Sequence, residues 1–158
     1  GTTTLGYSRE RFLAVQLAAN LFFAIGIAVA AVRADQTSSR SVMLLGACAT
    51  VLLGLVFGAG LTSGSLWIIF ATLAGALMVM GFVYGPLGSW LPTLFPVTVR
   101  YTGISLAFNI GGIIGGALAP FAAAWAANVG GTAYVGLFLT VAGIMTVAGV
   151  NFAPKLRD

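Results

Sequence analysis

Charge is what this sequence has least of. Only 6% of its 158 residues are charged, histidine is absent, and 59% are hydrophobic, whereas about a quarter of the residues of a soluble domain are charged. So few polar groups cannot cover a water-exposed surface, and lipid is therefore expected to be the solvent for most of the chain. The net charge of +4 is too small and too scattered for a nucleic-acid interface.

The residues of catalytic and metal sites are equally scarce. The single cysteine, Cys48, rules out an internal disulfide, and its place in an apolar run predicts a small buried hydrophobic side chain. No cluster of cysteine, histidine and carboxylate residues has metal-ligand spacing, and no nucleophile is paired with a base. The sequence therefore predicts neither an enzyme nor a metal or other cofactor.

Long apolar runs dominate instead. A bilayer crossing takes about 20 helical residues, and helices are favoured because a backbone in lipid must satisfy its own hydrogen bonds. The predicted fold class is an all-α integral membrane protein, with residues 1–158 as a single membrane domain. Five spans are expected, at residues 12–32, 42–61, 66–91, 102–124 and 132–152.

Three of the five prolines lie in or just after the third of these runs. Pro86 and Pro92 are expected to bend it, because neighbouring helices can satisfy the carbonyls that a proline frees. Pro96 is expected to end it, because the residue before a proline avoids the α conformation.

Basic residues predict the orientation. If the N-terminus lies on side one, the loops place more basic residues on side two, and the positive-inside rule then makes side two cytoplasmic. The N-terminus is therefore expected outside and the C-terminus inside the plasma membrane. Because no leader precedes Gly1, we expect the chain to be the C-terminal portion of a longer protein. Side one holds Arg9 and Arg11, and side two holds Arg33, Arg40, Arg100, Lys155 and Arg157.

The most distinctive stretch is YGPLGSWLPTLFPVTVRYTGISLAFNIGGIIGGALAP, residues 84–120. Its Tyr-Gly-Pro, its Leu-Phe-Pro-x-x-Val-Arg-Tyr-x-Gly loop and its Gly-Gly-rich helix ending in Ala-Pro resemble the segment joining helices ten and eleven of the major facilitator superfamily. The resemblance is strongest to the metabolite–proton symporter branch, which includes permeases for dicarboxylates, shikimate, and betaine or proline. It implies that the five spans are helices eight to twelve, most of the C-terminal six-helix half, and that helices one to seven are missing.

The charged motifs of that family are incomplete here. In the family's loop motif Gly-x-x-x-Asp-Arg-x-Gly-Arg-Arg, this chain has Gln36, Ser38 and Ser39 where Arg, Gly and Arg usually stand. The family's Glu before Leu-Phe-Pro is replaced by Thr93. A charge network between these loops is therefore expected to be weaker than in the family.

Three charged residues remain candidates for a cytoplasmic gate. The resemblance implies that such charges latch one conformation and separate during alternating access, with Asp35 paired to Arg40 or Arg100. The alternative interpretation is that all three only determine topology within the headgroup region.

Polar side chains within the spans are costly in hydrocarbon, so they are candidates for a substrate cavity. An amide both donates and accepts hydrogen bonds, which suits a carboxylate or a zwitterion, although interhelical hydrogen bonding explains an Asn almost equally well. The cavity candidates are Gln16, Asn20, Tyr84 and Asn109.

Small residues four apart mark the fourth span. Such pairs allow another helix to approach closely in lipid, where packing rather than hydrophobicity holds helices together. The residues predicted to pack in this way are Gly111, Gly112, Gly115 and Gly116.

Two functions remain open. One is proton-coupled symport of a small organic solute, such as a dicarboxylate or a betaine, by alternating access between two halves. The other is a non-transporting membrane subunit, a degenerate transporter half that stabilises or anchors a larger complex. No Asp, Glu, Lys, Arg or His lies at the centre of any span, so a proton-coupling group must lie in the missing helices. The expected partners are the lipid bilayer, the solute and proton, and the missing N-terminal half.

Overall fold

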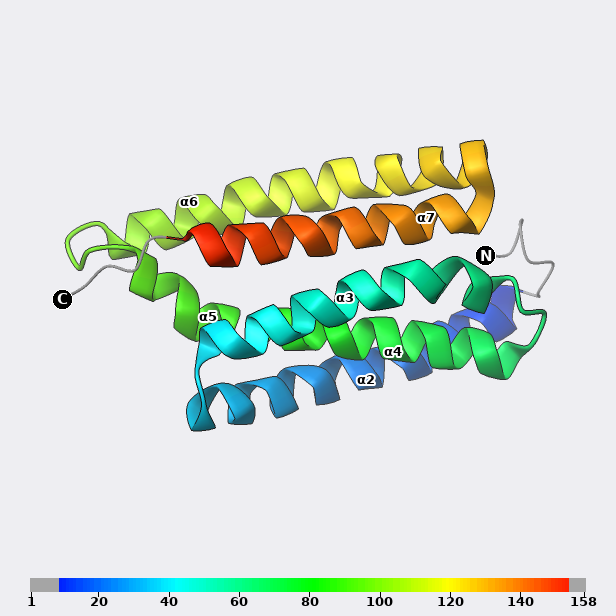
Figure 1. Ribbon diagram of the computed structural model, residues 1–158, viewed down its shortest axis with the longest axis horizontal. Coiled ribbons are helices and arrows are strands. Elements are labelled where there is room, and N and C mark those ends of the chain that lie inside the picture. The colour runs from blue at the N-terminus through cyan, green and yellow to red at the C-terminus, as the bar shows by residue number, and fades with distance from the viewer. Residues whose placement is uncertain (1–8, 154–158) are drawn as a thin grey trace.

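The computed structural model describes residues 9–153, apart from the side chains of Arg9 and Arg11, and this part of the chain is almost entirely helical (Figure 1). No strand occurs in the described range, which confirms the predicted all-α class. Lys155 and Arg157, which entered the prediction of orientation, lie outside it. The elements are α2 (Arg9–Gln36), α3 (Ser39–Leu61), α4 (Leu66–Tyr84), α5 (Leu87–Trp90), the 3₁₀ segment η1 (Leu91–Leu94), α6 (Arg100–Ile113), the π-helical segment η2 (Ile114–Leu118) and α7 (Ala119–Phe152).

Four helical segments of the described chain are long and apolar enough to cross a membrane. The first three contain the first three predicted spans. The fourth is 53 residues long and contains both of the last two. The four segments are Phe12–Gln36, Ser39–Leu61, Leu66–Leu94 and Arg100–Phe152.

The fourth segment is not one straight helix. Two residues within α7, Gly130 (φ −136°, ψ 16°) and Gly131 (φ 68°, ψ −156°), have non-helical backbone angles and divide it into two helices. The chain reverses direction there, so that the later part of α7 runs back towards the end at which α6 begins (Figure 1). The backbone of Gly131 lies in a region that only glycine adopts readily.

The proline-rich stretch is bent as the sequence predicts. Helix α4 ends at Tyr84, and Pro86, which is buried, precedes the short α5. Pro92 lies within the 3₁₀ segment η1. Phe95 is extended (φ −124°, ψ 136°), as expected of a residue before a proline. The bent segment leads from α4 across to α6.

Close helix crossings form the core, and small residues make them possible. Helix α3 packs most extensively on α7, α2 packs on α4, and α3 also packs on α4. Gly54 of α3 lies against Gly136 and Thr140 of α7, and the Thr140 hydroxyl donates to the Gly136 carbonyl oxygen at 3.0 Å. Such crossings rely on backbone proximity, as in membrane helix bundles.

Helix α6 and η2 differ from the rest because none of their residues is buried. They are joined to α4 through α5 and η1, while α2, α3 and α4 form the other side of the bundle (Figure 1). The π-helical turn begins within the glycine-rich sequence at Ile114, and π-helical turns are frequent at functional sites.

The prediction that Cys48 is buried is wrong, because its side chain is exposed on α3. An apolar run in a soluble protein would be driven into the core. In a membrane segment, an apolar side chain on the outside faces hydrocarbon at no such cost.

Candidate functional site

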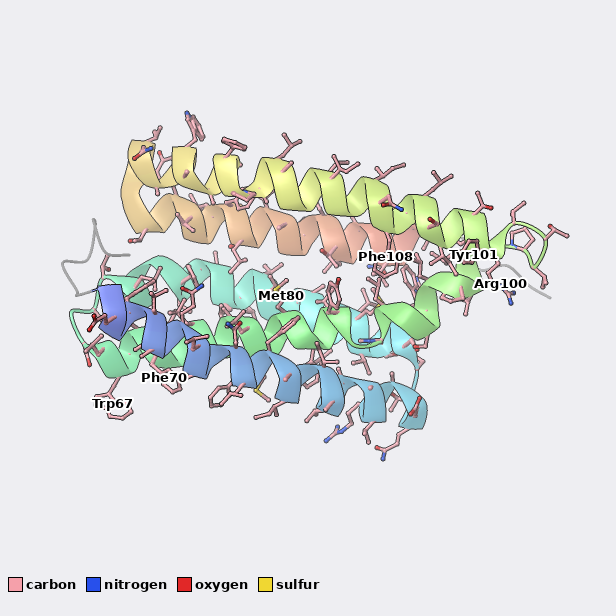
Figure 2. All side chains as sticks on the ribbon, turned by 180° about the vertical axis from the view of Figure 1, so that it is seen from behind. Trp67, Phe70, Met80, Arg100, Tyr101 and Phe108 are labelled. Carbon is pink, nitrogen blue, oxygen red and sulfur yellow. The ribbon has the colours of Figure 1, made fainter. Side chains whose placement is uncertain are left out.

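A groove of about 630 Å³ lies between α4 and α6. One wall comes from α4, α5 and η1, and the other from α6 and η2. Figure 2 shows Met80 and Phe108 in the band between α4 and α6. No charged side chain lines the groove, and Tyr84 supplies its single polar side-chain group. The lining residues are Met80, Tyr84, Leu87, Leu91, Ala107, Phe108, Gly111, Gly112, Gly115 and Gly116.

The structure brings only one of the four cavity candidates to this groove. Tyr84 is half exposed there, and its ring packs edge-on against Phe23 of α2 with centroids 6.1 Å apart. Asn109 is exposed on α6, and its amide donates to the Ser105 carbonyl oxygen of its own helix at 2.8 Å. Gln16 and Asn20 are exposed on α2 and are not part of the lining.

The glycines predicted to pack against another helix line the second wall. A Cβ atom added to Gly111, Gly112, Gly115 or Gly116 would have no other atom within 4 Å, apart from the helix's own backbone and chain neighbours. Thus none of the helices in the part of the chain that the structure describes packs on this face. The packing prediction remains a prediction.

The first gate candidate, Arg40, contacts α7 rather than Asp35. One terminal nitrogen, Nη2, donates to the backbone oxygen of Asn151 at 3.1 Å and lies 3.5 Å from its side-chain Oδ1. The Nε of Arg40 is buried and has no hydrogen-bond partner. Asn151 lies in the last turn of α7, where carbonyl groups lack helical partners and the helix end is partly negative. Arg40 therefore caps α7.

The other two gate candidates are also unpaired with each other. Arg100, the first residue of α6, donates from Nε to the Phe95 carbonyl oxygen at 3.3 Å. Asp35 is exposed and, within residues 9–153, makes no ion pair with Arg40 or Arg100. Arg40 and Arg100 thus make separate contacts with backbone oxygens, and Asp35 is paired with neither of them.

A polar contact that sequence reasoning missed links α3 to α5. The hydroxyl groups of Ser39 and Ser89 are 2.8 Å apart, although the residues are 50 positions apart in the chain. Ser89 also lies 3.0 Å from the Pro86 carbonyl oxygen, to which its hydroxyl can donate. The sequence analysis treated Ser39 only as a lost arginine. A hydroxyl three residues after Pro86 in an apolar span was the signal available for Ser89.

Comparison with known proteins gives the class of this chain. It is 37% identical over 146 residues to the inner membrane metabolite transport protein YhjE of Escherichia coli, covering 91% of this chain and 33% of the relative. It is 31% identical over 154 residues to a metabolite transport protein of Haemophilus influenzae, covering 98% of this chain and 34% of the relative. No protein-family model matches, and no solved structure matches significantly.

A further relative is a transporter of proline and betaine by its name. The chain is 28% identical over 146 residues to the proline/betaine transporter of Escherichia coli, covering 90% of this chain and 29% of the relative. The homologues of this chain are thus metabolite and proline/betaine transporters and not enzymes. They confirm the resemblance to part of a major facilitator transporter, and with four apolar helical segments the chain is part of a multi-pass membrane protein. The chain spans about a third of the length of these relatives.

Proposed function

We propose that this chain is part of a secondary active transporter that couples uptake of a small organic solute to proton entry by alternating access. The observation that carries the proposal is the similarity to named metabolite and proline/betaine transporters over about nine-tenths of the chain. The described geometry supports it: the chain has long apolar helices, a groove lies between α4 and α6, and the end of α2 lies at the same end of the bundle as the starts of α3 and α6.

The proposal includes five membrane crossings. A single helix of the 53 residues from Arg100 to Phe152 would be about 80 Å long, whereas the hydrocarbon core is about 30 Å thick. The reversal at Gly130 and Gly131 supports two antiparallel crossings instead. Because the ends that carry Arg33, Arg40 and Arg100 lie together, this end is proposed to be cytoplasmic and the N-terminus external.

The solute path is proposed to include the exposed polar residues of the spans. Gln16 and Asn20 are one helical turn apart on α2, and neither makes a hydrogen bond within the described residues. Amides facing hydrocarbon would remain unsatisfied, so we propose that this face borders the water-filled path, with Tyr84 and Asn109 contributing from α4 and α6. The proton-coupling group is proposed to lie in helices outside this sequence, because no span here contains an Asp, Glu, Lys, Arg or His near its centre.

Uptake into proteoliposomes tests the proposal. Full-length protein is reconstituted and given labelled betaine, proline or a dicarboxylate under an inward-acid pH gradient. We expect uptake of one solute class that a protonophore abolishes. Uptake that persists after the gradient is collapsed would contradict proton coupling.

The gate is proposed to act at the cytoplasmic end. Among residues 9–153, Asp35 is paired with neither Arg40 nor Arg100 and can pair with them only after this end of the bundle rearranges. Asp35→Lys is therefore expected to lower the rate of uptake without changing the amount of folded protein. Uptake unchanged by this charge reversal would remove Asp35 from the gate. Thr37→Lys, at a nearby exposed residue that is a variable position of the loop motif, is the matched control.

The replaced motif residues favour a second candidate, a non-transporting membrane subunit. Ser39 and Thr93 make neutral hydrogen bonds where the family carries charges, so an ionic latch is reduced in this chain. Under this alternative, the folded full-length protein transports none of the solutes and co-purifies with a larger complex.

A further inference from the structure

The loop between η1 and α6 is short, and its residues 96–99 are exposed. Before the loop, the Phe95 nitrogen donates to the Pro92 carbonyl oxygen at 3.4 Å. Within it, the Val99 nitrogen donates to the Pro96 carbonyl oxygen at 3.1 Å. An exposed loop with few buried contacts has little to fix its conformation. Contacts between its flanking side chains therefore decide how firmly α6 is joined to η1.

Two side-chain contacts join the end of η1 to the first turn of α6. The Nε of Arg100 donates to the Phe95 carbonyl oxygen at 3.3 Å. The Phe95 ring lies against Gly103, where an added Cβ would be only 2.6 Å from the ring atom Cε1. Arg100 and Gly103 are three residues apart and therefore share one face of the helix. Phe95, Arg100 and Gly103 together form what we call the loop clip.

Helix α6 has few other attachments in the described part of the chain. None of its residues is buried, and among residues 9–153 it packs chiefly on η1 at its start and on η2 at its end. Figure 2 shows Arg100 at the end of α6 that adjoins the loop. The loop clip thus fixes the position of the first turn of α6 relative to η1.

On the other side of the loop, η1 is continuous with α5. The backbone nitrogen of Leu91 donates to the Leu87 carbonyl oxygen, and the Thr93 hydroxyl donates to the Trp90 carbonyl oxygen at 2.6 Å. Both bonds cross the boundary between the two elements, so α5 and η1 form one stiff segment. With the loop clip in place, this segment and the first turn of α6 must turn together.

We propose that Arg100 is a positioning residue for transport, which through the loop clip makes α5, η1 and the first turn of α6 move as one body during alternating access. This rests on the proposed transport function. The part of Arg100 that acts is its Nε–H group and not its charge, because its partner is a carbonyl oxygen, which also accepts from an uncharged N–H group. This role is separate from an ion pair with Asp35.

Two substitutions of Arg100 separate the hydrogen-bond donor from the charge. Arg100→Gln places an amide nitrogen the same number of bonds from Cα as Nε, so the bond to Phe95 can form without a cation. Arg100→Lys keeps the cation but places a methylene group at that point. Both variants are made in the full-length protein. The rate of uptake into proteoliposomes is measured over a range of concentrations of whichever labelled solute the wild-type protein takes up.

We expect Arg100→Lys to lower the maximal rate about fivefold, the size expected for one lost hydrogen bond, with little change in the half-saturating solute concentration. Arg100→Gln should stay within about twofold of the wild-type rate. The reverse order would overturn the proposal and assign Arg100 to a charge network. Equal rates for the two variants would also overturn it.

The contact of the Phe95 ring is tested without any solute by Gly103→Ala. Alanine forms helices better than glycine, so a loosened α6 would come from displacement of the ring. Gly88→Ala is the matched control, because Gly88 is an exposed helical glycine of α5 whose added Cβ would have open space around it. Spin labels are placed at Leu52 of α3 and Ile110 of α6, both exposed, in full-length protein without other cysteines. Pulsed electron paramagnetic resonance then gives the distribution of distances between them.

We expect Gly103→Ala and Arg100→Lys to broaden this distribution, and Gly88→Ala and Arg100→Gln to leave it as in the wild-type protein. An unchanged distribution in Gly103→Ala would overturn the loop clip. Absence of uptake by the wild-type protein would contradict the proposed function, whereas the label distances report on the loop clip alone. The two failures are therefore distinguishable.

Discussion

The α3–α7 crossing and the α6–η2 face use the same residue for opposite situations. At the crossing, Gly54 lies so close to Gly136 and Thr140 that no side chain fits between the helices. On the α6–η2 face, Gly112 and Gly116 point into an open groove. The difference shows that a pair of glycines allows another helix to approach closely but does not ensure that a helix packs there. Substitutions in the two regions should therefore have unequal effects.

The largest effect is expected at the closed crossing. Gly54→Leu forces a side chain against the backbone nitrogen of Thr140, 2.7 Å from the added Cβ, so the helices must separate. Overpacking costs about 1–3 kcal/mol or more, and we expect loss of most folded protein in detergent, measured by size-exclusion chromatography. Gly75→Ala is the control, since its added Cβ meets only Leu53 at 3.5 Å. Equal yields of the two variants would contradict the crossing.

The fold-back of α7 should be the next most sensitive. Gly131→Ala is expected to cost about 1–3 kcal/mol of stability because φ 68° with ψ −156° is strained for any residue with a side chain. Gly131→Asn should not rescue it, since asparagine tolerates positive φ only near the left-handed helical region. Thermal melting checks both variants. Wild-type melting of Gly131→Asn would show that the reversal does not need this backbone geometry.

The contact between Ser39 and Ser89 extends the comparison to α5, which borders the groove. In a Cys48→Ala background, Ser39→Cys with Ser89→Cys is expected to crosslink on oxidation and to slow uptake reversibly, because α5 is then held to α3. Each single cysteine variant is the control. A quantitative crosslink that leaves uptake unchanged would mean that α5 stays against α3 throughout transport.

The smallest effect is expected at Arg40. Arg40→Gln removes the cation from the end of α7, and helix-end charges contribute about 0.3–1 kcal/mol at exposed sites. Asn151→Ala should cost less, since the shorter bond from Arg40 goes to the backbone oxygen, which alanine keeps. Melting temperatures of the two single variants and the double variant test this order. If Asn151→Ala lowered the melting temperature as much as Arg40→Gln, the important contact of Arg40 would be with the Asn151 side chain.

Sequence reasoning succeeded where the signal was local. The bend at Pro86 and the extended residue before Pro96 follow from the geometry of proline itself. It failed for Cys48, because hydropathy cannot say which side of an apolar helix faces lipid. It also missed the contact of Ser39 with Ser89 and that of Arg40 with Asn151, since both join residues far apart in the chain.

The sequence by itself determined the solvent, the helical class and the resemblance to metabolite transporters. Scarce charge and long apolar runs leave few other possibilities, and the 84–120 stretch is distinctive without any structure. Only the tertiary structure decided which glycines are covered, where Arg40 binds and which cavity candidate meets the groove. The physical reason is that the side chains of an apolar helix point in all directions around its axis. Which of them another helix contacts depends on where the helices cross in the folded protein.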